Sequence, residues 1–453
     1  MRDEMVVDVQ KFIDDRHFSG FQKLVLVLCF LIVAIDGFDT ASIGFIAPAI
    51  RAEWHLSAAS LAPLFGIGLF GLMSGALLLG PLADRYGRKP ILLFSVVFFG
   101  LASLLSAFST DLNMLLVLRF LTGLGLGGAM PSAITLTSEY CPTPRRSGLV
   151  TLMFCGFTIG SALGGLIAAH LLGSVGWRGV LVAGGLFPLL LAPCLFLMLP
   201  ESLRWLILKG RNGERIVRRM LVASEALPKL VVQDRKLTGS PVAELFRHGL
   251  LGGTILLWLT FFMSLLIIYL LSSWLPTLLH SSGRSLSGAA LITSMFQVGG
   301  TIGAILLGRW MDRFNPYKVL LLAYLAAAVC IVVVGVSVGN ALLLATAVFG
   351  VGFGVSGSQV GVNALSAAFY PTANRATGVS WASAIGRSGS VIGSMVGGLM
   401  ITLQLDNQQI FFIMAVPAVI AALALMLMGR LIRARDLQSA SVPNTPVPEG
   451  SPS

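Results

Sequence analysis

The sequence predicts an all-α polytopic membrane protein, with twelve transmembrane helices arranged as two related six-helix bundles. Hydrophobic residues make up 56% of the chain and charged residues only 11%, against roughly 25% charged in soluble domains. Apolar runs that can fill a bilayer, where a spanning helix needs about 20 residues, continue along the chain as far as Arg430. Two polar motifs also recur in register half a chain apart, which predicts the division into two bundles.

The elements follow in order along the chain. Residues 1–22 are polar and of mixed charge, unlike a secretory signal, and we expect an uncleaved N-terminal segment. A first bundle over 23–199 has spans at 23–50, 59–83, 90–109, 113–138, 148–172 and 177–199. A polar linker over 200–250 should carry short surface helices. A second bundle over 251–429 has spans at 251–279, 287–308, 317–338, 341–368, 376–402 and 408–429, and we expect a disordered tail over 430–453.

The placement of the cations predicts the orientation. Of the 31 Lys and Arg residues, only Arg51, Arg178 and Arg284 fall in loops on one side, and Arg119 and Arg387 fall inside spans. All the others lie on the side that holds both termini. By the positive-inside rule this side is the cytoplasm. The net charge of +11 is therefore assigned to membrane topology and not to nucleic-acid binding.

Two motifs of the first bundle recur in the second. The loop GPLADRYGRKP at 80–90 returns as GRWMDRFNPYK at 308–318, and YCPTPRRSG at 140–148 returns as YPTANRATG at 370–378. Repeats in the same orientation are typical of transporters whose substrate site lies near the midplane between the halves.

The loop at 80–90 resembles the signature loop of the major facilitator superfamily, and its second copy is degenerate at Asn315 and Pro316. DGFDTASIG at 36–44, SEYCPTPRRSG at 138–148, PESLRWL at 200–206, SSWLPTLL at 272–279 and the run at 361–398 resemble the aromatic acid:proton symporters of bacteria. The resemblance covers most of the chain. It implies inward transport of hydroxybenzoate, protocatechuate, benzoate or a similar acid across the bacterial inner membrane.

Charged residues at the cytoplasmic ends of the helices are candidates for gating. An acid among cations at a helix end can form a breakable cluster that shuts this side in one state, although the cations could instead only fix topology. For Glu139 we expect pairing with Arg145 or Arg146. The candidates are Asp84, Arg85, Arg88, Asp312, Arg313, Glu139, Arg146 and Arg375.

Ionisable groups inside spans are costly and are candidates for function. Asp36 and Asp39 lie three residues apart on one helical face, with Asp36 about 20 Å from the cytoplasmic end of its span. Two carboxylates so close in a low dielectric should not both ionise readily, so the pair is a candidate proton site. The alternative is that hydroxyls such as Thr40 and Ser42 satisfy each acid.

Two arginines inside spans are candidates for contact with an anionic substrate. Arg387 lies at a depth similar to Asp36, and its planar guanidinium matches a carboxylate. It could instead pair permanently with Asp36 or Asp39. Arg119 could attract anions, neutralise an aspartate or snorkel to the interface.

An aromatic substrate also needs a ring-binding surface and partners for a ring hydroxyl. For each aromatic candidate, lipid contact or core packing is the alternative, and for the amides it is helix–helix contact. The candidates are Phe38, Tyr269, Trp274, Phe353 and Trp381 for the ring, and Asn363 and Gln359 for the hydroxyl.

Motifs of other functional classes either lie in the wrong structural context or are absent from the sequence. The GxGxxG matches at 123–128 and 352–357 lie inside spans, where a nucleotide site is not expected, and no Lys precedes Ser or Thr as in a P-loop. Glycines spaced GxxxGxxxG at 156–164 and 389–397 predict close helix packing instead. The five cysteines and five histidines show no metal-type spacing.

We therefore expect a monomeric transporter and no enzyme, with no cofactor and no metal, whose partners are a small aromatic acid, a proton and the bilayer. The alternatives are an exporter or antiporter of organic acids or drugs, and a non-transporting sensor of aromatic acids.

Overall fold

The computed structural model describes residues 6–211, 213–220, 229–231, 245–246, 250–337, 339–370 and 375–440. The first bundle, here the N-half, contains α2 (Gly20–Glu53), α3 (Leu61–Tyr86), α4 (Arg88–Ser106), α5 (Leu112–Tyr140), α6 (Arg146–Ser174) and α7 (Trp177–Met198). The second, the C-half, contains α11 (Leu251–Ser281), α12 (Leu286–Arg313), α13 (Pro316–Val336), α14 (Ala341–Val351), the π-helical η2 (Gly352–Ser356), α15 (Gly357–Phe369), α16 (Arg375–Thr402) and α17 (Asn407–Ala440). The short elements are β1 (Val6–Asp8), α1 (Val9–Asp14), η1 (Thr143–Arg145), α8 (Leu203–Leu208), α9 (Glu214–Met220) and β2 (Lys229–Val231).

Within the described residues, twelve helices are long and apolar enough to cross a membrane, with α14, η2 and α15 together forming the tenth. Each predicted span coincides with one of them, so the predicted fold class is confirmed. The last helix is longer than predicted, because α17 continues to Ala440 beyond the expected end at 429. Residues 430–437 are mostly Arg, Leu and Ala, which favour helix, so the charges there end the apolar stretch without ending the helix.

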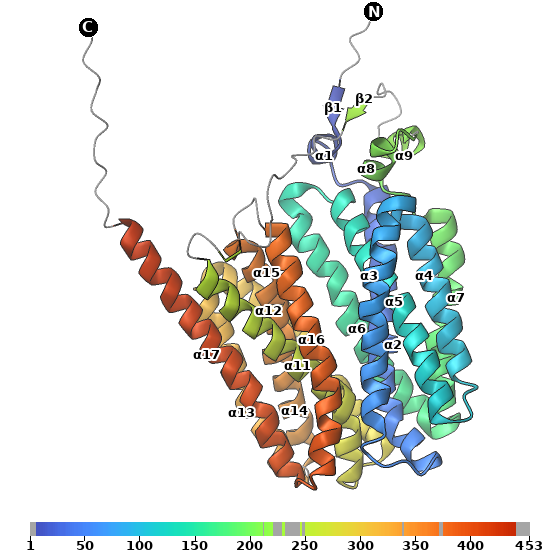
Figure 1. Cartoon of the computed structure of the whole chain (residues 1–453), viewed down its shortest axis with the longest axis vertical. Helices are drawn as coiled ribbons and strands as arrows, with labels where there is room; N and C mark the ends of the chain where they lie inside the picture. The colour runs from blue at the N-terminus through green and yellow to red at the C-terminus, as the bar shows by residue number, and fades with distance from the viewer. Residues whose placement is uncertain are drawn as a thin grey trace, which may run out of the picture.

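The two bundles stand side by side, and β1 and the last residues of α17 lie at the same end, called the terminal end below (Figure 1). Helices within each half approach closely along the predicted glycine faces. A Cβ added at Gly160 of α6 would collide with the backbone of Ala34 in α2, and one at Gly393 of α16 would collide with the backbone of Leu266 in α11. The GxxxG interpretation is therefore confirmed in both halves.

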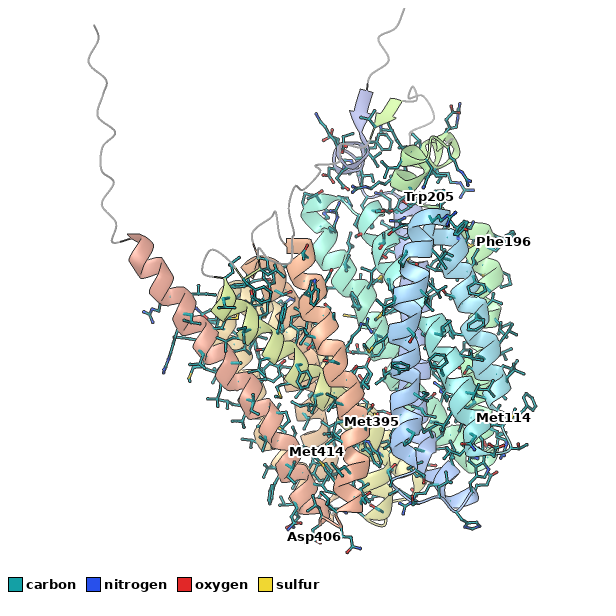
Figure 2. All side chains as sticks on the ribbon, viewed as in Figure 1. Met114, Phe196, Trp205, Met395, Asp406 and Met414 are labelled. Carbon is teal, nitrogen blue, oxygen red and sulfur yellow. The ribbon has the colours of Figure 1, made fainter. Side chains whose placement is uncertain are left out.

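The halves meet most closely at the far end, opposite the termini. There Phe65 of α3 packs edge-on against Trp274 of α11, with ring centroids 5.0 Å apart. Met395 of α16 lies at the boundary between the bundles and contacts Gly66 of α3 (Figure 2). Nearer the middle, the hydroxyls of Thr158 and Thr301 are 2.6 Å apart. The ribbons diverge toward the terminal end (Figure 1).

A small cap, built from β1, α1, α8, α9 and β2, sits on the N-half at the terminal end (Figure 1). Strands β1 and β2 pair in parallel, with Val7 opposite Leu230. The apolar face of α1 packs in one core cluster with α9, through Phe12 and Ile13 on one side and Val217 on the other. The linker therefore has the expected short helices, whereas the structure of the N-terminal segment was not predicted.

Candidate functional site

A buried ion pair joins two helices of the N-half. Asp39 of α2 and Arg119 of α5 are 0% and 4% exposed, and Asp39 Oδ2 lies 2.6 Å from Arg119 Nη2. A second guanidinium nitrogen, Nη1, donates to Oδ1 at 3.3 Å, and the hydroxyl of Ser103 in α4 donates to the same oxygen at 2.8 Å. Arg119 therefore neutralises Asp39 and does not snorkel to the interface. With three donors, this carboxylate is satisfied as an anion.

Asp36 lies one helical turn nearer the terminal end and has a different environment. It is 2% exposed, and its Oδ1 accepts from Thr40 at 3.2 Å. Its Oδ2 is buried and has no hydrogen-bond partner among the described residues. The charges of Asp39 and of Arg387 both act on it. The two acids predicted as one pair are thus near each other, but only Asp39 is fully satisfied.

A small cavity of about 30 Å³, partly open to solvent, lies beside Asp39 and Arg119. Its walls come from α2, α3 and α5 of the N-half and from α11 of the C-half. The polar side chains among the lining residues are Asp39, Thr40, Arg119, Tyr269 and Ser273, and the apolar ones include Ile43, Leu64, Phe65 and Leu69. The cavity therefore combines ionic groups with an aromatic and aliphatic surface at the boundary of the halves.

Arg387 of α16 is half-buried and reaches across to the N-half. Its one hydrogen bond within the described residues is a 3.7 Å contact from Nη2 to Met130 Sδ of α5, a weak acceptor. Its charge acts on Asp36 and on Tyr269. No ion pair between Arg387 and either aspartate forms within the described residues, so the alternative of a permanent pair is not realised in this structure.

Of the predicted substrate residues, Arg119 and Tyr269 line this cavity, whereas Arg387 and the remaining candidates are not among its lining residues. Phe38 packs edge-on against Phe187 inside the N-half, at 5.4 Å between centroids. Trp274 is fully buried and its Nε1 donates to the carbonyl of Ser394 at 2.7 Å. Trp381 is 41% exposed and stacks on Trp258.

The two amide candidates lie in α15. Gln359 Nε2 is 3.4 Å from Asn363 Oδ1, and Asn363 is exposed. The buried Oε1 of Gln359 has no hydrogen-bond partner among the described residues. These side chains lie toward the terminal end, away from the cavity. Phe353 lies in η2, whose helical structure within the tenth span agrees with the rejection of a nucleotide site at 352–357.

The predicted gating residues lie at the terminal end, and their contacts stay within each half. Asp84 pairs with Arg88, one turn along the chain, at 2.7 Å, and its side chain is 72% exposed. The guanidinium of Arg85 lies over the ring of Tyr86. Asp312 and Arg313 are exposed, and the side chain of Arg375 lies outside the described residues.

The expected pairing of Glu139 with Arg145 or Arg146 is wrong. The cations acting on Glu139 are Arg88 and Arg204, the charge of Glu201 opposes them, and the hydroxyl of Ser202 donates to Glu139. Arg146 instead acts on Asp14 of the N-terminal segment, and its Nε has no hydrogen-bond partner within the described chain. The reason is that α8 folds back beside the end of α5, a tertiary contact with no sequence signal.

Sequence reasoning named Thr40 as a possible partner of the acids, and it donates to Asp36, but it missed Ser103. Ser103 lies in an ordinary apolar span and belongs to no motif. Among the described residues, no group of three or more His, Cys, Asp or Glu side chains could hold a metal ion.

Comparisons with known proteins agree with this architecture. Residues 29–291 and 257–450 match the model of the Major Facilitator Superfamily. The chain is 48% identical to the 4-hydroxybenzoate transporter PcaK of Pseudomonas aeruginosa, over 93% of this chain and 96% of that protein. It is 45% identical to the gallate transporter of Pseudomonas putida, over 93% and 95%. The solved structure of a D-xylose-proton symporter superposes with a TM-score of 0.70 at 20% identity, covering 90% of this chain and 97% of that one.

Proposed function

Because the chain belongs to the major facilitator superfamily and its relatives are transporters of aromatic acids, we propose that it carries an aromatic carboxylate into the cell together with a proton. Hydroxylated benzoates such as 4-hydroxybenzoate, gallate and protocatechuate are the substrates we expect, with benzoate as a simpler member. The protein is a multi-pass membrane transporter and not an enzyme. The proton coupling and the direction are the proposal.

The observation that supports proton coupling is the difference between the hydrogen-bond partners of Asp36 and Asp39. Asp39 has a full set of donors from Arg119 and Ser103, which suits an ionised carboxylate. Asp36 has one donor and a buried oxygen without a partner, which suits a carboxylic acid whose proton can be taken up and released. We propose that Asp36 holds the proton in this conformation, and that the neighbouring Asp39 anion makes a second ionised carboxylate unfavourable.

Arg387 is the proposed anchor for the substrate carboxylate. Its guanidinium has only the weak Met130 sulfur as hydrogen-bond acceptor among the described residues, so its donors can turn to an anion. Tyr269 lines the cavity, and the charges of both Arg387 and Asp36 act on its hydroxyl. Binding an anion beside Arg387 removes a positive charge that favours ionised Asp36, so substrate and proton should bind together.

The terminal end carries most of the cations and should face the cytoplasm of the bacterial inner membrane. With the halves packed at the far end and diverging toward the termini, this conformation is then inward-facing. In the opposite state, the clusters around Asp84 and Asp312 would meet across the halves and close the cytoplasmic side.

Uptake by the purified full-length protein in proteoliposomes tests the proposal. With a panel of radiolabelled 4-hydroxybenzoate, gallate, protocatechuate and benzoate, an inside-alkaline pH gradient should drive accumulation, and collapsing the gradient should abolish it. Asp36→Asn should lose accumulation but keep exchange of labelled for unlabelled substrate, because a neutral amide resembles the protonated acid. Arg387→Ala should lower uptake of every acid about ten- to hundredfold, in line with a hydrogen-bonded charge contact, while Arg430→Ala, an exposed arginine on α17, should not.

Other outcomes would identify the alternatives. Accumulation that survives collapse of the gradient would refute proton coupling. Gradient-driven efflux would indicate an exporter or antiporter, and binding of these acids without flux would indicate a sensor.

A further inference from the structure

The carboxylate of Asp39 is enclosed by three neighbouring helices. Arg119 approaches it from α5 and Ser103 from α4, and Gly184 of α7 lies beside Ser103 and Asp39. A Cβ at Gly184 would lie 3.3 Å from Ser103 Oγ and 3.5 Å from Asp39 Oδ1. Ser103 itself is fully buried. Ser103 is therefore shielded from water and is not among the residues that line the cavity.

The two partners of Asp39 differ in chemistry. A guanidinium has only donors, so Arg119 can bind the carboxylate anion but cannot accept a hydrogen bond from a carboxylic acid. A hydroxyl donates and also accepts. The hydroxyl of Ser103 can therefore donate to ionised Asp39, as it does here at 2.8 Å, and can turn to accept the proton of neutral Asp39.

We propose that Ser103 is a positioning residue for proton coupling, which keeps Asp39 in one place while its carboxyl group changes between the charged and the neutral form. This inference rests on the proposed symport and extends it, because it assigns to the acid pair a second site that the proton visits. In the conformation described here, the three donors to Asp39 suit an ionised carboxylate, and the unpartnered Oδ2 of Asp36 suits a carboxylic acid. When Arg119 moves away from Asp39 in another state, Ser103 remains as its partner.

Charged and titratable groups around Asp39 could also influence the pH dependence of uptake. Asp36 lies on the same helix and Arg119 on α5, while Tyr269 lines the same cavity from α11 and Arg387 acts through Asp36. Ser103 of α4 and Gly184 of α7 face this carboxylate, and neither is titratable. None of the four titratable side chains is altered when Ser103 is replaced, so any change in pH dependence reports the lost hydroxyl.

Replacing Ser103 by Ala removes a donor from the anion and an acceptor from the acid. Hydrogen bonds to a charged group are about twice as strong as neutral ones, so the ionised form of Asp39 loses more stabilisation than the neutral form. Asp39 should therefore bind a proton more readily in the variant than in the wild type. The pH of half-maximal uptake should rise by about one unit, a tenfold change in proton affinity.

The matched control is Ser106→Ala. Ser106 lies one turn further along α4, is equally buried, and donates to the carbonyl of Ala102 in its own helix at 2.8 Å, so it does not touch Asp39. Both variants lose one buried hydroxyl from the same helix. Only Ser103→Ala should move the pH profile.

The experiment measures initial uptake of 4-hydroxybenzoate into proteoliposomes between pH 5 and 9, for the wild type, Ser103→Ala and Ser106→Ala. Ser103→Cys, with a nearly isosteric but weak donor, should give a smaller shift in the same direction and replaces the alanine variant if that variant does not fold. An unchanged pH profile in Ser103→Ala, or an equal shift in Ser106→Ala, overturns the role of Ser103 while leaving symport intact. A wild type with no pH dependence overturns the symport and this inference together.

Discussion

Removing one member of the Asp39–Arg119 ion pair would leave the other charge buried and unpaired. Arg119→Leu should therefore lower the free energy of unfolding by about 3–5 kcal/mol. The double variant Asp39→Asn with Arg119→Leu should recover part of this loss, because no ionised group then remains. Thermal unfolding of the purified protein in detergent, followed by tryptophan fluorescence, measures both.

The chain contains a matched control for this prediction. Arg178 and Glu53 form an ion pair of the same length, 2.6 Å, but their side chains are 42% and 43% exposed. Arg178→Leu should change stability by only about 0–1 kcal/mol, because water screens the pair and solvates the remaining charge. Equal losses of unfolding free energy in Arg119→Leu and Arg178→Leu would mean that the burial of an ion pair does not determine how much stability its loss removes.

At the residue scale, sequence reasoning found the charges of the candidate site and named Arg119 and Thr40 among possible partners of the acids, but it could not decide which contacts form. Asp36, Asp39, Arg119 and Arg387 stand out because ionisable residues are rare in apolar spans. Their pairing depends on how helices rotate and pack, and Ser103 is an ordinary small polar residue until α4 is placed against α2. The spacing of three residues predicted that the two acids would not both ionise readily but left open which one carries the proton, and their neighbours on other helices make them different.

At the scale of elements, α1 holds the turn that connects α5 and α6. Asp14 accepts from the backbone N–H and from the hydroxyl of Thr143, both at 2.7 Å, and Gln10 Nε2 lies 3.4 Å from the carbonyl of Cys141. Cys141 is 2% exposed beneath this contact. Burial raises the pKa of the Cys141 thiol to about 11.

Releasing this contact should therefore expose a native thiol. We expect Asp14→Ala to raise the rate at which a water-soluble maleimide labels Cys141 by at least about tenfold, because exposure increases the fraction of reactive thiolate. Asp15→Ala removes the neighbouring, exposed acid and should leave the rate unchanged. Mass spectrometry of the labelled peptide measures the rate, and equal rates in both variants would show that α1 does not protect the turn.

The pH dependence of this contact follows from the pKa of Asp14. Burial alone would raise that pKa, but the hydrogen bonds from Thr143 and Gln10 and the charge of Arg146 outweigh it and hold the pKa below its ordinary value. A lowered pKa in the folded state stabilises the contact above the ordinary value of about 3.9, and the stabilisation is lost only as the pH falls through the lowered pKa. Between pH 6 and 8, the protection of Cys141 by α1 should not change.

The elements were predictable to different degrees for a physical reason. A span is set by a long apolar stretch that its own sequence records, so all twelve were found. The elements β1 and α1 are short and polar on one side, and they are stabilised by contacts with the linker more than 200 residues away, such as Val7 with Leu230. Local sequence holds no comparable signal for them.

At the scale of the whole molecule, the repeats predicted two halves but could not predict how they are tilted. A transporter must pass through states that open to opposite sides, and both states keep the same helices and nearly the same packing within each half. The sequence therefore encodes the bundles, while the inward-facing arrangement proposed here depends on a few contacts at the far end.

A disulfide across that far end should lock the halves. A Cβ at Gly398 of α16 would lie 2.7 Å from the Cβ of Ala62 in α3, so Ala62→Cys with Gly398→Cys needs only a small separation to reach the spacing of about 3.8 Å found in disulfides. Because alternating access requires the far end to open, oxidation of this double variant should abolish uptake and reduction should restore it. Gly350→Cys is the control, since its Cβ would lie 3.5 Å from the Cβ of native Cys330 within the C-half, and that disulfide should leave uptake nearly unchanged. Full uptake by the oxidised Ala62→Cys and Gly398→Cys protein would mean that α3 and α16 do not separate there, and the two halves would have to exchange access by a motion other than opening at the far end.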